Sequence, residues 1–246
     1  MICFRVTRYC NAHCGFCLAP PDGGIHPPFS ILKHRIDWLF KRGVNTIHFC
    51  GGEPTIHHDL GDLIKYVHSQ GKKSKLTTNG ISISDKLINI VFNCRTEVKV
   101  SLHGPKAHHD EIVGREAFDS TSTSVIRLVS AGVSTSVQTT IVTGHLEIVN
   151  WSIGFCLENK VKRVSFLPFI PRGSGYDNRS KYELSPIEKR NLQNLVRQKR
   201  RQLSNRMDIR LLDFNSTPIH VMESDGRLLL EGATEGMDKL LCNVDS

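Results

Sequence analysis

Short β-rich runs alternate with longer amphipathic stretches along most of the chain, and this alternation limits the possible folds more than any other feature. Six runs rich in Val, Ile, Thr and Phe are typical of strands: residues 2–6, 46–50, 74–78, 97–102, 134–142 and 163–167. Between them, apolar residues recur with helical spacing over residues 31–41, 60–69, 83–92, 122–131 and 146–158. Repeated strand–helix units predict a parallel sheet with crossover helices.

The expected fold class is therefore α/β, and both a doubly wound sheet and a partial TIM-type barrel satisfy the pattern. In both architectures, the active site lies at the carboxyl ends of the strands. Chemically distinctive residues follow these ends: a cysteine triplet after the first strand, Gly-Gly-Glu-Pro after the second, Thr-Thr-Asn-Gly at the third, Ser-Leu-His-Gly at the fourth and Pro-Phe-Ile-Pro-Arg-Gly at the sixth. We expect the functional residues to gather at this rim.

The remainder of the chain has a different pattern. We expect a Gly/Pro-rich loop over residues 168–185, followed by a basic helix from Pro186 to about Arg206, with proline at its permitted first turn. Short β-like runs follow at residues 209–213, 219–223 and 228–230, with an Asp225-Gly226 turn. These features predict a core barrel over residues 1–185 and a small C-terminal α+β extension over residues 186–246 that packs on the barrel.

Composition and charge narrow the class of protein. Of the 246 residues, 39% are hydrophobic and 23% charged, which indicates a globular chain. We expect a cytoplasmic protein without a membrane span, because there is neither a long apolar run nor a secretory signal. The net charge of +8 favours anionic partners. Much of this excess lies in residues 197–210, which suit either a solvated helix face or a phosphate-contacting surface.

Three of the eight cysteines, Cys10, Cys14 and Cys17, form a Cys-x3-Cys-x2-Cys motif. A disulfide framework is not expected in a reducing compartment, so the tight spacing indicates a metal. Three thiolates on one loop can hold three irons of a [4Fe–4S] cubane and leave the fourth iron open to another ligand. Zinc is disfavoured, because a structural zinc site requires four ligands and His13 adjoins Cys14 too closely to chelate with it.

The triplet, with Phe16 before its last cysteine, resembles the signature of the radical S-adenosylmethionine (radical SAM) superfamily. The resemblance covers roughly residues 1–175 and includes the Gly-Gly-Glu-Pro motif at residues 51–54. It implies a partial (β/α)6 barrel, with a [4Fe–4S] cluster and S-adenosyl-L-methionine (SAM) as cofactors. It also implies that Glu53 receives the methionine ammonium and that Leu167 and Pro168 face adenine. The full set of implied cofactor residues is Phe16, Gly51, Gly52, Glu53, Pro54, Thr78, Asn79, Ser101, His103, Leu167 and Pro168.

The resemblance implies one-electron chemistry, in which reductive cleavage of SAM gives a 5′-deoxyadenosyl radical that abstracts hydrogen from the substrate. It also implies an electron donor such as flavodoxin or ferredoxin. This chemistry requires no acid–base pair, so we assign no classical catalytic residue. Candidate substrate residues lie near the rim: Arg172, Arg115, Gln138 and Tyr176. Arg172 is the strongest of these candidates, because a guanidinium at the mouth of the sixth strand can bind an anionic group.

Three functions fit the sequence. The first is a single-cluster enzyme acting on a small anionic molecule, such as a nucleotide, a sugar phosphate or a natural-product precursor. The second is modification of a peptide, or of an RNA bound by residues 197–210. The third is a non-enzymatic metal-binding module. The motifs look nearest to the GTP cyclase, peptide-modifying and viperin-like branches. An auxiliary cluster is not expected, because only Cys242 lies beyond Cys156, and Cys50 is expected to be a small buried residue.

Overall fold

One curved sheet organises the molecule. The computed structural model describes residues 1–21, 25–213 and 218–245, and in these residues ten strands lie in the order β10-β9-β8-β1-β2-β3-β4-β5-β6-β7. Its central strands are β1 (Ile2–Arg5), β2 (Thr46–Cys50), β3 (Lys73–Thr78), β4 (Glu97–Ser101), β5 (Thr135–Ile141) and β6 (Arg163–Pro168). Each of these six strands pairs in parallel with the next. The predicted parallel α/β sheet is therefore confirmed.

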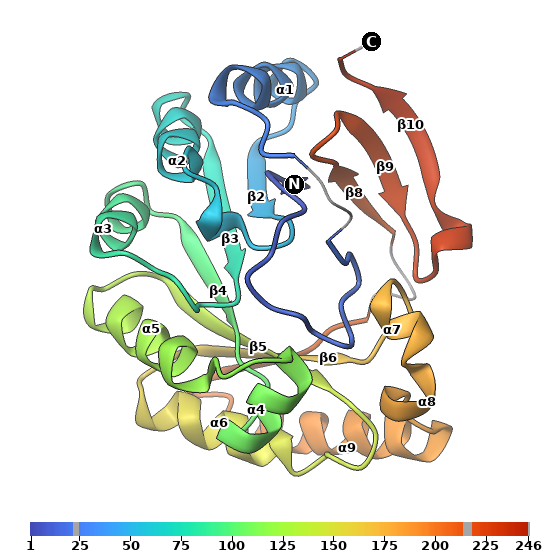
Figure 1. Ribbon diagram of the computed structural model, residues 1–246. Helices are drawn as coiled ribbons and strands as arrows, with labels where there is room; N and C mark the ends of the chain where they lie inside the picture. Colours follow the sequence, from blue (N-terminus) through green and yellow to red (C-terminus); the bar gives the residue numbers. More distant parts are fainter. Residues whose placement is uncertain (22–24, 214–217, 246) are drawn as a thin grey trace.

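Helices cover the outer, convex side of the sheet (Figure 1). They are α1 (Phe29–Lys41), α2 (Leu60–Ser69), α3 (Asp85–Asn93), α5 (Phe118–Ser130) and α6 (Ile148–Glu158). Helix α4 (Lys106–Val113) lies instead at the rim, against the loop after β1. Alternate strand residues, such as Phe4, Phe49 and Phe166, are fully buried in one core with Leu32 and Leu63 of the helices. Because side chains alternate along a strand, the residues between them face the inner side, which we call the lumen face.

Several local expectations from the sequence are wrong. Helix α1 begins at Phe29, two residues before the apolar pattern over residues 31–41, with Pro28 at its N-cap. Helix α4 was not expected, since its short polar sequence has only a weak apolar pattern. The expected loop at residues 168–185 contains two four-residue helices, α7 (Ser174–Asp177) and α8 (Arg179–Tyr182). The structure therefore has more helix around the rim than the sequence pattern predicts.

The C-terminal segment extends the sheet at both ends. Helix α9 (Pro186–Gln202) begins at a capping box formed by Ser185 and Glu188, and it leads into β7 (Asp208–Leu211), which pairs in parallel with β6. Strand β8 (Ile219–Met222) pairs in parallel with β1. It continues into antiparallel β9 (Arg227–Glu231) and β10 (Lys239–Asn243), the latter after a 3-10 turn, η2 (Glu235–Met237). One sheet thus runs through both predicted parts, and the division at residue 185 stays a prediction.

Helix lengths and hydropathy bear on the expectation about membranes. Among the helices of the described residues, none combines the length and the apolar character needed to cross a bilayer.

Candidate active site at the rim of the half-barrel

The three cysteines of the motif lie on the segment that connects β1 to α1, which crosses the open side of the half-barrel in Figure 1. Cys10, Cys14 and Cys17 all carry free thiols. The backbone N–H of His13 donates to Val113 O at 3.0 Å, which anchors the loop to the end of α4. The unexpected helix α4 therefore supports the cysteine loop.

The loop folds back on itself at the cysteines, where the backbone N–H of Cys17 donates to Cys14 O at 3.1 Å. Burial raises the pKa of Cys14, and the neighbouring Cys17 and Cys10 raise it further, because adjacent thiolates repel one another. The pKa of Cys10 and of Cys17 is also raised, mainly by burial. Clustered, desolvated thiols of this kind need a cationic centre to hold them as thiolates. The donor set therefore fits a metal centre.

Gly51 and Gly52 join this loop to the end of β2. The N–H of Gly52 donates to Thr7 O at 2.9 Å, and the N–H of Glu53 donates to Tyr9 O at 2.8 Å. A Cβ atom at Gly52 would lie 2.1 Å from Tyr9 O, and one at Gly51 would lie 2.3 Å from Thr7 O. The two glycines are thus required for close approach of two backbone segments. Their expected contact with SAM stays a prediction.

Glu53 is buried, with 1% of its surface exposed. Its Oε1 accepts hydrogen bonds from Thr55 N, Thr55 Oγ1 and Thr78 Oγ1 at 3.0, 2.6 and 2.7 Å, and its Oε2 accepts one from Asn79 N at 2.7 Å. Burial raises the pKa of this carboxyl, while the hydrogen bonds oppose the rise. No Lys, Arg or His of the described residues forms an ion pair with it, so a cationic ligand would complete the site.

Asn79 and Thr78 connect the carboxylate to the cysteine loop. The Asn79 side-chain amide donates to Asn11 Oδ1 at 2.7 Å and lies 4.0 Å from Cys10 Sγ. Its backbone oxygen accepts a hydrogen bond from Thr121 Oγ1. The structure therefore brings Thr78, Asn79, Glu53 and the first cysteine into one hydrogen-bonded unit. Asn11 was missed, although its position between the first two cysteines was the signal that could have identified it.

Phe16 and His103 also meet at the rim. The Phe16 ring packs edge-on against the His103 ring with centroids 4.9 Å apart, and His103 stacks on His109. Backbone N–H groups of Thr140 and His103 donate to Nδ1 of His103 and of His109, respectively, so each ring keeps its proton on Nε2. Burial, together with His109, lowers the pKa of His103 well below its ordinary value. His103 is thus a neutral Nε2–H donor.

The remaining expected cofactor residues occupy the ends of their strands. Ser101 ends β4 half-buried, and its hydroxyl makes no hydrogen bond to the rest of the described chain. Leu167 is buried near the end of β6 but lies outside the core that fills the helix side, and Pro168 follows it. Pro54 begins a buried 3-10 turn, η1 (Pro54–Ile56). These positions stay predictions for the binding of SAM.

The four candidate substrate residues have different surroundings. Arg172 donates to Asp238 at 2.8 and 2.6 Å and to Glu231 at 3.3 Å, so carboxylates of the C-terminal segment already occupy its guanidinium. Arg115 donates to Asn11 O on the cysteine loop. Tyr176 is exposed beneath the Arg179 guanidinium, and Gln138 accepts a hydrogen bond from Lys99 on the lumen face. The structure thus gives Arg172 a role in attaching the C-terminal hairpin, which the sequence did not indicate.

The lumen face holds a disulfide that was not expected. Cys3 of β1 and Cys50 of β2 are joined, with Cα atoms 6.4 Å apart. Both residues are half-buried and alternate with core residues of their strands, so they face the lumen. The sequence suggested that Cys50 is a small buried residue. In the structure it is instead half-buried and bonded to Cys3.

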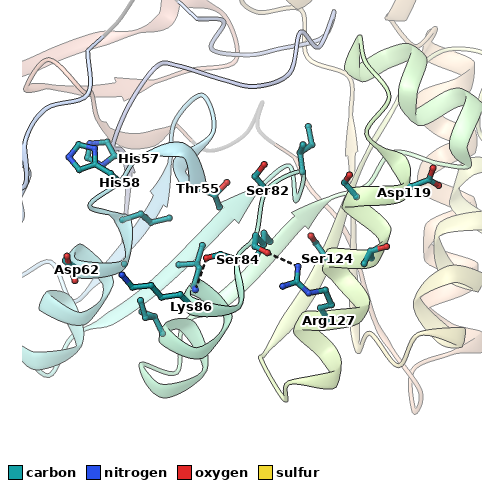
Figure 2. Close-up of a pocket in the computed structure, with 18 residues that line it drawn as sticks. Thr55, His57, His58, Asp62, Ser82, Ser84, Lys86, Asp119, Ser124 and Arg127 are labelled. Atoms are coloured by element: carbon teal, nitrogen blue, oxygen red, sulfur yellow. Dashed lines mark hydrogen bonds between the residues drawn. The ribbon is translucent and has the colours of Figure 1, made fainter.

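A separate cavity of about 770 Å³ lies on the outer side, between η1, α2, α3 and α5. Figure 2 shows that Thr55, Ser82, Lys86, Asp119 and Arg127 surround it. Arg127 is engaged by Ile83 O and Asp85, and none of the three motif cysteines lines the cavity. This cavity adjoins the Glu53 turn through Thr55 but does not contain the candidate metal centre.

His57, His58 and Asp59 lie beside this cavity with ligand atoms close enough to share a metal ion. However, Nε2 of His57 donates to Pro27 O at 3.0 Å, and its Nδ1 accepts from Asp59 N at 3.2 Å. Because both ring nitrogens are occupied, His57 has no lone pair for a metal. The hydrogen bonds of His57 therefore exclude a metal site formed by His57, His58 and Asp59 in this arrangement.

A parallel half-barrel with three clustered thiols on its first loop and a buried, unpaired carboxylate after its second strand defines a metal-dependent class of α/β enzyme core. Residues 4–148 match the family model of the radical SAM superfamily. This match covers more than half of the chain, and the chain belongs to the radical SAM superfamily. Membership implies SAM and an iron–sulfur cluster as cofactors.

Two curated relatives illustrate the range of the superfamily. The chain is 28% identical over 210 residues to the Fe-coproporphyrin III synthase of Methanosarcina barkeri, which covers 82% of this chain and 52% of the relative. It is 36% identical over 86 residues to an S-adenosylmethionine-dependent nucleotide dehydratase of Selenomonas ruminantium, covering 34% of this chain and 31% of the relative. The chain thus spans about half the length of the first relative and less of the second.

A solved structure supports the architecture. SuiB of Streptococcus suis, bound to its precursor peptide SuiA, superposes with a TM-score of 0.82 at 19% identity, over 94% of this chain and 59% of SuiB. At this identity the likeness concerns the fold alone. It confirms the partial (β/α)6 barrel expected from the sequence.

Proposed function

We propose that this chain is a radical SAM enzyme in which Cys10, Cys14 and Cys17 hold a [4Fe–4S] cluster and Glu53 receives the ammonium group of SAM. The buried Glu53 carboxylate carries this proposal, because it has four hydrogen-bond donors but no ion-pair partner among the described residues. When bound, these cofactors supply one-electron chemistry that generates a 5′-deoxyadenosyl radical. The chain itself binds and orients the reactants and keeps water away from them.

The surrounding residues suit these tasks. The Thr78 hydroxyl and the N–H groups of Thr55 and Asn79 hold the Glu53 carboxylate in one orientation. The free hydroxyl of Ser101 and the Nε2–H of His103 supply donors for the carboxylate or ribose of SAM. Phe16, beside His103, and Leu167, across the rim, provide apolar surface for adenine.

The substrate that we propose is a small anionic molecule, and the charge of the lumen face supports this. Lys75, Arg163 and Arg210 on this face are paired with Glu97 or Asp208 at 2.6–3.0 Å. These two carboxylates serve three cations, and a fourth cation, Lys99, lies on the same face. The strands β3 to β7 therefore present more positive than negative charge to the lumen.

Lys99 is a half-buried cation of this face that has no carboxylate partner among the described residues. Its Nζ donates to the neutral Gln138 Oε1 at 3.1 Å, and no carboxylate of the described residues forms an ion pair with it. Burial, together with Lys75 and Arg210, lowers its pKa, because the charged ammonium is poorly compensated there. A phosphate or carboxylate group of the substrate would supply the missing charge.

A second charged cluster, around Arg5 and Arg172, has enough carboxylates to balance its cations. Arg5 pairs with Glu223 and Glu231, and Arg172 pairs with Glu231 and Asp238. Carboxylates here match or outnumber the guanidinium groups, so this cluster needs no added anion. It attaches the C-terminal hairpin to β1 instead.

The proposal is tested by anaerobic reconstitution with iron and sulfide, followed by reduction in the presence of SAM. We expect a brown protein that releases 5′-deoxyadenosine. Binding of pyrophosphate and of nucleoside triphosphates should then weaken in Lys99→Gln, whereas Lys199→Gln on α9 is the matched control. Colourless protein that binds zinc and does not cleave SAM would instead support a metal-binding module.

RNA modification is tested separately. Arg200 and Arg201 are exposed in the last turn of α9. If RNA is the substrate, binding should fall steeply with salt and weaken when both arginines are replaced by glutamate. We expect no such effect, because the helix face is solvated and the uncompensated cation lies in the lumen. A peptide substrate would give modified peptide with no dependence on Lys99.

A further inference from the structure

The disulfide between Cys3 and Cys50 lies in an unusual setting for a structural cross-link. The same chain keeps three thiols free on the cysteine loop, and a cluster on that loop requires them to be reduced. In compartments where such thiols stay reduced, the disulfides that form are usually transient and serve catalysis or redox sensing. The pair is therefore expected to cycle between disulfide and dithiol.

The position of the pair relates it to the candidate active site. Cys50 immediately precedes the Gly51-Gly52-Glu53 turn, so its Cα lies at most about 11 Å of chain from that of Glu53. Its register partner on β1 is Arg5. Arg5 shares Glu223 with Arg8, whose guanidinium donates to Pro20 O on the cysteine loop at 2.9 Å. The pair thus lies on the lumen face directly below the rim.

Both members of the pair also keep part of their surface exposed. Cys3 and Cys50 are half-buried, whereas their strand neighbours Phe4 and Phe49 have no exposed surface. Cys156, by contrast, is fully buried in the helix-side core. A molecule in the lumen could therefore contact Cys3 and Cys50, whereas it could not reach Cys156.

We propose that Cys3 and Cys50 form a redox-active thiol pair that donates a hydrogen atom to a carbon-centred substrate radical in the lumen. This inference rests on the proposed function. An S–H bond is weaker than the C–H bond that forms when an alkyl radical takes its hydrogen atom. A thiol within contact distance can therefore quench a carbon-centred radical. A pair is better suited than one thiol, because the second sulfur captures the thiyl product as a disulfide.

The step balances as follows. One S–H bond breaks and one C–H bond forms on the substrate, which leaves a thiyl radical. The second thiol loses its proton to solvent and bonds to the thiyl sulfur. The surplus electron would be accepted by the oxidised iron–sulfur cluster that Cys10, Cys14 and Cys17 would hold. A dithiol reductant of the thioredoxin class restores the pair by thiol–disulfide exchange. The substrate is thereby rearranged or epimerised without net oxidation.

The first test uses cluster-free protein. The protein is equilibrated with mixtures of reduced and oxidised dithiothreitol, and the alkylation of Cys3 and Cys50 is measured by mass spectrometry. We expect the two thiols to be oxidised and reduced together and reversibly. A disulfide that resists reduction until the protein unfolds would overturn the proposal, because such a pair cannot cycle.

The second test uses reconstituted protein with SAM in D2O and titanium(III) citrate as the reductant, after removal of small thiols. Without substrate, the reduced pair offers exchangeable S–H bonds close to the Gly51-Gly52-Glu53 turn, and these are weaker than the O–H and N–H bonds at the rim, so 5′-deoxyadenosine should gain one deuterium. Cys3→Ser/Cys50→Ser should still produce 5′-deoxyadenosine, but without deuterium. Cys94→Ser, which alters a cysteine at the end of α3, is the matched control and should keep the label.

The outcomes separate the two proposals. Unlabelled 5′-deoxyadenosine from the wild type would overturn the hydrogen-donor role and leave the proposed function standing. Absence of 5′-deoxyadenosine from the wild type itself would overturn the proposed function. Retention of the label in the double variant would show that a different group donates the hydrogen.

Discussion

The backbone N–H of Asn79 donates a hydrogen bond to Glu53 at 2.7 Å, so the end of β3 fixes the carboxylate that follows β2. The side chain of Asn79 reaches the cysteine loop through Asn11. The cysteine loop and the Glu53 carboxylate are thus held in one arrangement before any cofactor binds. Such preorganisation lowers the entropic cost of binding.

Replacing Glu53 with Gln should weaken SAM binding while leaving the cluster intact. The loss of a charge-assisted contact with the ammonium group corresponds to roughly 10- to 100-fold in Kd. Equilibrium dialysis with reconstituted protein measures this change, and the iron content is checked in parallel. The matched control is Glu116→Gln at an exposed position, which should bind SAM normally. An unaltered Kd in Glu53→Gln would contradict the assigned role.

Replacing Gly52 with Ala should separate the cysteine loop from β2. The added Cβ would lie 2.1 Å from Tyr9 O, and relief of this clash disrupts the hydrogen bonds beside it. We expect a loss of about 1–3 kcal/mol in unfolding free energy and a lower iron content after reconstitution. Gly154→Ala in α6 is the control, because its Cβ meets no atom within 4 Å. Equal iron content in both variants would argue against this coupling.

Arg172 and Asp238 should contribute pH-dependent stability. Burial alone would raise the pKa of Asp238, but the hydrogen bonds from Arg172 and Gly232 hold it below the ordinary value of 3.8. The contribution is therefore complete above about pH 4 and is lost as the pH falls further through the folded-state pKa. Asp238→Asn should lose about 1–3 kcal/mol at pH 7, between the values for exposed and buried pairs.

Urea denaturation at pH 7 and at pH 3 measures this dependence. The difference in stability between wild type and Asp238→Asn should shrink at the lower pH. Arg200→Ala on the exposed face of α9 is the control and should change stability little at either pH. A constant difference between wild type and Asp238→Asn at both values would show that the ion pair is not the source of the effect.

The strands of the half-barrel could be predicted from the sequence because they are short runs rich in Val, Ile, Thr and Phe. Residues 46–50 match β2 throughout, since a core residue follows each lumen residue there. The same reasoning failed for β10, because its apolar residues Leu240 and Leu241 are exposed at the sheet edge. Local patterns thus identify strands with one buried face, including the edge strand β7, and miss β10, whose apolar residues are exposed.

The candidate site was predictable where residues share one motif and not where the fold brings distant segments together. Cys10 and Cys14 are recognisable because they are close in sequence. The Cys3–Cys50 bond depends on the register of two strands, and the ion pair between Arg172 and Asp238 depends on a hairpin far along the chain. A spacing rule cannot foresee contacts of this kind.

Iron and sulfide analysis of anaerobically reconstituted protein, with electron paramagnetic resonance of the reduced sample before and after SAM addition, tests the assignment of the three thiols most directly. We predict about four irons per chain and a signal that changes with SAM. Cys14→Ala should lose both the cluster and 5′-deoxyadenosine formation, whereas Cys94→Ala should keep them. Zinc in place of iron, a disulfide among Cys10, Cys14 and Cys17, or a cluster whose signal ignores SAM would contradict the assignment.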